Sequence, residues 1–129
     1  MSLTNSFETH TLQYLLTTDS LTRPTSWYIG LFTSDPTDTG SAGTEVSTGT
    51  GYARTSVTFS VTGDTASNSA AVEFPAASGG NWGTISHIGV MDAATGGNMI
   101  VHSALTTAKA INDGDVFRIP TGDLDITAA

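Results

Sequence analysis

The chain has 129 residues, of which 38% are hydrophobic and 12% are charged. This length suits one domain with one core, and so few charged residues cannot cover several long helices, which excludes a helical bundle. Twelve acidic residues against four basic ones give a formal net charge of −8, which excludes nucleic acid and an anionic membrane surface as partners, since both are bound by clustered Lys and Arg.

The residue types also indicate where such a chain works. It contains 23 threonines, 14 serines and no cysteine, so disulfides, thiolate metal sites and cysteine nucleophiles are absent. We expect neither a membrane span nor a signal peptide, because no apolar run reaches about 18 residues and the first residues lack a basic start and an apolar stretch. A disulfide-free chain with a Thr- and Ser-rich surface favours a component of a particle that is assembled inside a cell and then released.

The first nineteen residues differ from the rest and predict a short helix. Asn5 and Glu8 have the spacing of a capping box, in which each side chain bonds the backbone amide of the other residue. Apolar residues follow without Gly or Pro, which predicts a helix over residues 6–17. We therefore expect residues 1–19 to be a helical segment and residues 20–129 to form a single β-sandwich domain.

From Trp27 onward, strand-like runs alternate with turn residues. The run from Trp27 to Thr33 is nearly all apolar, which is typical of a buried strand, and we expect Trp27 to be buried. The pattern predicts about eight strands, over residues 27–33, 52–61, 69–74, 82–91, 98–105, 108–111, 116–119 and 123–127. This spacing predicts an all-β fold, an antiparallel β-sandwich or jelly roll, with the short helix at its N-terminus.

Glycines and a long loop mark the connections. Gly30, in the middle of the first strand, predicts a bulge or a close backbone approach. Gly96 and Gly97 supply the positive φ angles that a hairpin turn needs. Residues 34–51 form a long loop that is rich in Gly, Thr, Ser and Asp. With few anchors, this loop should be mobile in the free protein and ordered against a neighbour.

Three histidines are the first candidates for catalysis. His10 lies on the predicted helix, whereas His87 and His102 fall on the two strands that flank the glycine turn and can be cross-strand neighbours. Neither a cysteine nor a serine in a nucleophile-elbow context accompanies them. We interpret His87 and His102 as a packed or hydrogen-bonded pair, and the sequence predicts no catalytic residue and no enzyme activity.

Two pairs of aspartates are candidates for a calcium site. Asp113 and Asp115, and likewise Asp123 and Asp125, have the alternate spacing that presents two carboxylates on one strand face. Neither pair lies in a twelve-residue loop with a closing Glu, so turn and surface roles are favoured. The Gly-rich stretches precede neither a helix nor a lysine, so they are not phosphate loops. We expect no metal and no cofactor.

Five stretches of the chain carry a resemblance to a known family. They are residues 28–36 (YIGLFTSDP), 43–46 (GTEV), 51–54 (GYAR), 82–98 (WGTISHIGVMDAATGGN) and 105–111 (LTTAKAI). In their order and spacing they resemble a family of small virion proteins of tailed bacteriophages. The resemblance covers most of the chain, from the predicted helix to the last strand, and it implies a component of the virion.

Two virion roles follow from this resemblance. Relatives are often labelled tail-fibre proteins, and some similar small jelly-roll proteins look like capsid decoration, or cement, proteins. The size of the chain favours decoration, because fibres are long and repetitive whereas this chain has no repeat and no coiled-coil stretch. The expected function is to bind the outside of a phage head and stabilise the shell. A tail- or tail-fibre-associated role is the alternative, and a carbohydrate-binding module is a third.

The resemblance also implies partners and a place. Decoration proteins of this kind are usually homotrimers on local threefold axes, so the implied partners are the major capsid protein and further copies of the chain. The implied location is the exterior of the capsid, after synthesis in the host cytoplasm. A net charge of −8 on that surface keeps particles from aggregating.

The predicted helix is apolar on two sides. At 100° per residue, Leu3, Phe7 and Tyr14 cluster on one side, and Leu12, Leu15 and Leu16 occupy a second sector. One packing surface cannot cover both, so we expect these six residues to form an assembly interface with a sister subunit or the shell protein. The alternative is a helix that is wrapped by its own loops or frays.

Overall fold

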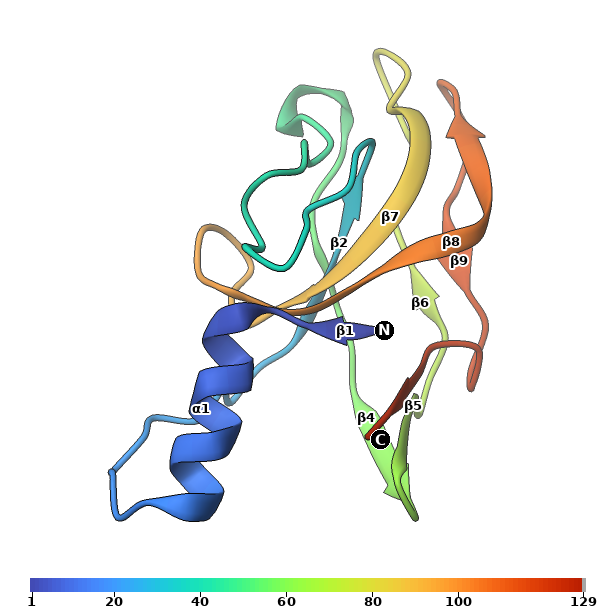
Figure 1. The fold of residues 1–129 in the computed structure, drawn as a ribbon. Coiled ribbons are helices and arrows are strands. Elements are labelled where there is room, and N and C mark those ends of the chain that lie inside the picture. The colour runs from blue at the N-terminus through green and yellow to red at the C-terminus, as the bar shows by residue number, and fades with distance from the viewer. Residues whose placement is uncertain (129) are drawn as a thin grey trace.

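A five-stranded antiparallel sheet forms the centre of the computed structural model, which describes residues 1–128 (Figure 1). Its strands, in spatial order, are β1 (Ser2–Leu3), β8 (Met99–Ile111), β7 (Gly83–Met91), β2 (Tyr28–Phe32) and β3 (Thr55–Ser56). The apolar run that the sequence marked as a buried strand is β2, and it lies between β7 and β3. An apolar strand is needed there because its side chains are buried from Ile29 to Phe32.

Two smaller antiparallel sheets complete the β domain. One has the order β10 (Asp125–Thr127), β5 (Thr65–Asn68) and β4 (Phe59–Thr62), and the other pairs β6 (Val72–Glu73) with β9 (Arg118–Ile119). A single turn of 3-10 helix, η1, spans Thr48–Thr50. The prediction of a mostly β, antiparallel fold with a short N-terminal helix is confirmed. The finer assignment to a sandwich or jelly roll stays a prediction.

The described residues form ten strands where the sequence predicted about eight. The predicted strand 52–61 is divided into β3 and β4, and β5 lies in a segment for which no strand was predicted. The predicted strands 98–105 and 108–111 are one strand, β8, because no Gly or Pro interrupts it and a register shift opposite Ser86 accommodates the extra residues.

Aromatic side chains form much of the core. Tyr52 packs edge-to-face against Trp82, with ring centroids 5.4 Å apart, and Phe74 contacts Tyr52, Trp82 and Phe117. Trp82 is buried. The expectation that Trp27 is buried is wrong, since Trp27 is only half-buried. It precedes β2 and lines a groove between two sheets.

Gly30 makes a close approach and not a bulge. Its pairing with Gly89 continues the unbroken register between β2 and β7. A Cβ on Gly30 would lie 3.2 Å from a carboxylate oxygen of Glu45 and 3.6 Å from the hydroxyl of Tyr52. In the turn that follows β7, Gly96 and Gly97 have φ angles of 60° and 69°, which confirms the predicted hairpin turn.

Helix α1 (Asn5–Leu16) begins one residue earlier than predicted. The predicted capping box is wrong. Asn5 lies within the helix, and the N-cap is Thr4, whose hydroxyl donates to the carbonyl of Met99 at 2.7 Å instead of capping the helix. Thr4 is buried and thereby ties the start of the helix to β8. Beyond that point α1 projects away from the sheets (Figure 1), and no residue of α1 is buried. No helix in residues 1–128 is long and apolar enough to span a membrane.

The long loop over residues 34–51 has more anchors than its sequence suggests. The amide of Val46 donates to the carbonyl of Leu31, and the amide of Thr33 donates to the carbonyl of Thr44. Pro36 and Val46 are buried. The expectation of few anchors is therefore wrong, while mobility of the loop in the free protein stays a prediction.

Candidate functional site

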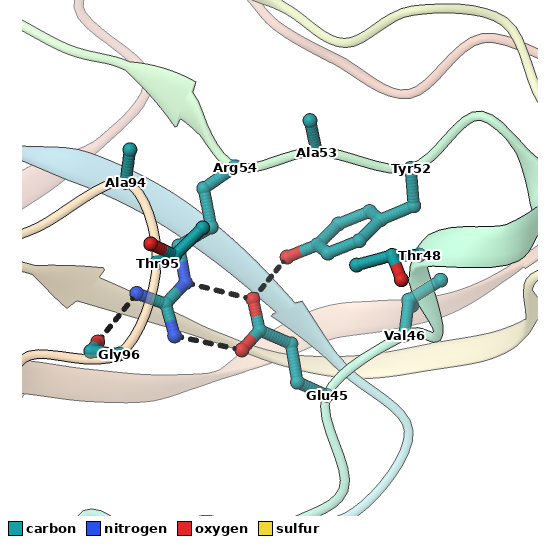
Figure 2. Close-up of a pocket in the computed structure, with 9 residues that line it drawn as sticks. All are labelled: Glu45, Val46, Thr48, Tyr52, Ala53, Arg54, Ala94, Thr95 and Gly96. Carbon is teal, nitrogen blue, oxygen red and sulfur yellow. Dashed lines mark hydrogen bonds and ion pairs between the residues drawn. The ribbon is translucent and has the colours of Figure 1, made fainter.

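Glu45, Tyr52 and Arg54 form a hydrogen-bonded polar cluster beside the core (Figure 2). Glu45 comes from the long loop, and the other two residues lie on the segment that leads into β3. The loop reaches this position because Glu45 bridges to Phe32 at the end of β2. The cluster therefore joins the long loop to the segment that leads into β3.

Arg54 is the centre of this cluster. Its Nε and Nη2 each donate to one carboxylate oxygen of Glu45 at 2.9 Å, which is the bidentate geometry that a guanidinium favours. Its Nη1 donates to the carbonyls of Ala93 and Gly96, at 2.9 and 2.8 Å, in the turn between β7 and β8. The side chains of Arg54 and Glu45 are 10% and 24% exposed, so the salt bridge is partly shielded from water and salt.

Tyr52 connects the salt bridge to the sheet. Its hydroxyl donates to Glu45 at 2.5 Å and accepts the amide of Leu31 at 3.0 Å. Burial and the hydrogen bond to Glu45 raise the pKa of the Tyr52 hydroxyl well above its ordinary value. Burial opposes ionisation of Glu45, but the hydrogen bonds from Arg54 and Tyr52 outweigh it and hold the pKa of that carboxyl below 4.5. The hydrogen bond to Glu45 likewise raises the pKa of Arg54.

A hollow of about 210 Å³ lies beside this cluster, lined also by Val46, Thr48 and Thr95. The polar groups of Glu45, Tyr52 and Arg54 are already bonded to one another. In residues 1–128, no buried side-chain nitrogen or oxygen is without a hydrogen-bond partner. The hydrogen bonds of this cluster hold the long loop, β2 and the β7–β8 turn together.

The two strand histidines lie against the long loop. His102 on β8 contacts Asp38 at 2.9 Å through Nε2 and lies 4.0 Å from Asp35 through Nδ1. His87 on β7 contacts Ser86 at 2.8 Å and lies 3.9 Å from Asp35. The expected hydrogen bond between His87 and His102 is not formed, because the register places His87 opposite Ala104 and His102 opposite Gly89, and each histidine bonds a different neighbour. His10 lies exposed on α1, edge-to-face with Phe7.

The aspartate pairs make turn and surface contacts. Asp113 accepts the amide of Gly79, and Asp115 accepts the amide of Asn112. Asp125 on β10 accepts the hydroxyl of Ser67 on β5. Over residues 1–128, no group of three His, Asp or Glu side chains is placed to hold a metal ion.

The six predicted interface residues do not share one surface. Leu3 belongs to β1 and pairs with Val101, so placing it on the helix was wrong. The other five lie on α1. Phe7, Tyr14 and Leu15 border a hollow against residues 21–24. Leu12 and Leu16 lie outside this hollow, and Leu12, Tyr14, Leu15 and Leu16 are all exposed.

Four residues with clear structural roles were not singled out from the sequence. Glu45, Tyr52 and Arg54 stand in two of the quoted stretches, GTEV and GYAR, and Thr4 precedes the helix. The sequence held one indication of Glu45 and Arg54. Charged residues are few in this chain, and each of these two stands in a stretch that carries the family resemblance. Their pairing depends on the path of a long loop, which residue spacing does not reveal.

The fold and the comparison with known families together define the class of this protein. One family model matches residues 2–127, almost the entire chain, and the chain is accordingly a structural protein of a phage virion. The family is that of the podophage GP4 fiber I protein gp80, and the chain belongs to it. No curated protein matches the chain. The resemblance to virion proteins of tailed phages is confirmed at this level.

Proposed function

We propose that this chain is a subunit of a short fibre on a tailed-phage virion, where it has a structural and not a catalytic role. The family description supports the fibre assignment. The observation that carries the structural role is helix α1, which projects from the β domain (Figure 1). Its side chains Leu12, Leu15 and Leu16 are exposed to solvent. Exposed apolar surface of this kind marks a site of association.

The chain assembles with copies of itself, as a homotrimer. A helix of twelve residues is marginal in water unless one of its faces is packed. Leu12 and Leu16 lie one turn apart on α1 and are exposed. A closed ring of identical subunits would cover them in every copy. The net charge of −8 supports protein partners and neither nucleic acid nor a membrane.

Capsid decoration is the second candidate, with the major capsid protein as the partner and the exterior of the head as the location. It is favoured by one observation, the absence of a repeat or heptad pattern in the sequence, which is unlike a long fibre. A jelly-roll fold is what the resemblance to capsid decoration proteins implies, so it is proposed together with this second candidate.

Labelling of whole virions tests the two candidates. An antibody or a small tag on the chain, seen by electron microscopy, should mark the tail only, and quantitative mass spectrometry should find few copies per virion. Label over the whole head with hundreds of copies would overturn the fibre proposal and support decoration.

A second experiment tests self-assembly. Deletion of residues 1–19 is unsuitable because it would also remove β1 and the buried Thr4. The double variant L12Q/L16Q should instead be a folded monomer by light scattering and circular dichroism. The matched control is V116Q, which alters an exposed apolar residue elsewhere and should still assemble. If L12Q/L16Q assembles as the wild type does, the helix is not the interface.

A further inference from the structure

An apolar groove of about 410 Å³ lies between the five-stranded and the three-stranded sheets. Both sheets line it with aliphatic side chains, Val61, Ala66 and Ile126 on one side and Leu3, Val90 and Val101 on the other. Val61 is 72% exposed although it lies on a strand. A groove of this size and character is typical of a binding site.

The helix of the same chain does not fill this groove. Its first turn is fixed by Thr4, whose hydroxyl and amide bond the carbonyls of Met99 and Ile100, and by the amide of Asn5, which bonds Asp38. From that anchor α1 runs to one side, clear of the β4–β5 hairpin (Figure 1). Its twelve residues span about 18 Å, so Leu12 and Leu16 are carried away from the sheets.

The charges around the groove and the helix are complementary. Arg23 is the one charged residue among the described residues that line the groove. Arg23 makes no salt bridge to a carboxylate within residues 1–128. The helix and the residues just after it carry Glu8 and Asp19 and no Lys or Arg. In a chain with a net charge of −8, these two surfaces can meet without bringing acids together.

We propose that the groove of one subunit receives the Leu12 and Leu16 face of α1 from a neighbouring subunit. This inference rests on the proposed self-assembly and names the two surfaces that meet. Helix and groove are different patches, so the contact is heterologous, and it forms a closed ring when the rotation between subunits closes. Each subunit then gives one helix and takes one, which leaves neither surface exposed.

Cross-linking tests this contact directly, because the chain has no cysteine of its own. One preparation carries Leu16→Cys and another carries Val61→Cys, and the two are co-assembled and treated with a short bismaleimide. A conjugate that joins position 16 of one chain to position 61 of another is expected. The matched control is Thr62→Cys, which lies next to Val61 on β4 and points to the opposite face. It should couple to Leu16→Cys at least tenfold less.

Two outcomes would overturn the proposal. If Leu16→Cys couples mainly to itself, the helices pack against one another and the groove is not their site. If Val61→Cys and Thr62→Cys couple equally, the contact is nonspecific. Light scattering on the same samples distinguishes failure of the proposed self-assembly from failure of the helix–groove contact alone. Monomers contradict self-assembly as a whole, whereas oligomers without the conjugate contradict only the groove.

Trp27 provides an independent readout, since it is half-buried and lines the groove. Acrylamide should quench its fluorescence at least twofold less in the assembled wild type than in the monomeric L12Q/L16Q variant. The variant W27F keeps only the buried Trp82 and should lose this difference. Equal quenching of assembled wild type and monomer would contradict insertion of the helix beside Trp27.

Discussion

The guanidinium of Arg54 and the carboxylate of Glu45 form two parallel hydrogen bonds, each 2.9 Å long. The same guanidinium holds the turn between β7 and β8 through the carbonyl of Gly96 (Figure 2) and through that of Ala93. One side chain thus connects the long loop and the β7–β8 turn to the segment that leads into β3.

Replacing Arg54 with methionine should destabilise the fold by about 3 kcal/mol, because it leaves the Glu45 carboxylate partly buried without its cation. Urea unfolding followed by circular dichroism measures the loss. R118M, at an exposed arginine on β9, is the control and should change stability by less than about 0.5 kcal/mol. The double variant E45Q/R54M should lose less than the sum of the single variants. Strict additivity would show that the salt bridge contributes nothing.

Replacing Tyr52 with phenylalanine should cost about 1–3 kcal/mol, because the buried amide of Leu31 loses its acceptor and Glu45 loses a donor. The control is Y28F, since the Tyr28 hydroxyl makes no hydrogen bond within residues 1–128 and the ring is half-buried. Thermal unfolding of both variants provides the comparison. Equal melting temperatures would contradict a structural role for the Tyr52 hydroxyl.

The stability of the fold should fall at both ends of the pH range. Glu45 has a lowered pKa when folded, so its contribution is present above its ordinary value of 4.5 and is lost as the pH falls through the folded pKa. Tyr52 has a raised pKa when folded, so stability falls as the pH rises above the ordinary value of 10.0, where only the unfolded chain ionises. Urea midpoints against pH measure both effects.

Two single variants isolate these contributions to the pH dependence. E45Q should flatten the acid limb of the profile, whereas E73Q, at an exposed glutamate on β6, should not. Y52F should flatten the alkaline limb. Profiles that coincide with the wild type would contradict the assignment of these limbs to Glu45 and Tyr52.

Two adjacent glycines in the β7–β8 turn should respond differently to alanine. Both have similar positive φ angles, 60° at Gly96 and 69° at Gly97, so each variant carries backbone strain of about 1 kcal/mol. A Cβ at Gly96 meets open space, but at Gly97 it lies 2.7 Å from the Cβ of Ala93. G97A should therefore lose about 1–3 kcal/mol more than G96A in urea unfolding. Equal losses of stability in the two variants would contradict the predicted clash between a Cβ at position 97 and Ala93.

Hydrogen exchange should divide the long loop into two parts. The amide of Val46 is bonded to β2 and should exchange slowly even in the free protein. Residues 37–41 are mostly exposed and should exchange faster in the free protein than in the assembly. Equal protection of residues 37–41 in both states would contradict the prediction that this part needs a neighbour.

Much of the architecture could be predicted from local patterns. Apolar alternation, glycine turns and a low charge content led to an antiparallel β fold with a short helix at its N-terminus, and the family resemblance led to a phage virion. Strand β2 could be predicted because it is apolar from Tyr28 to Phe32. Hydrophobic periodicity and turn residues determine structure over a few neighbouring residues, so they can be recognised from the sequence alone.

The tertiary structure decided whatever depends on contacts between distant residues. Asn5 and Glu8 have the spacing of a capping box, but the helix begins after Thr4, whose hydroxyl donates to the carbonyl of Met99, 95 positions away. Glu45 and Arg54 are ordinary surface residue types until a folded loop brings them together out of water. Burial and pairing are properties of the packed chain, and the energy of each polar group depends on the partner that packing provides.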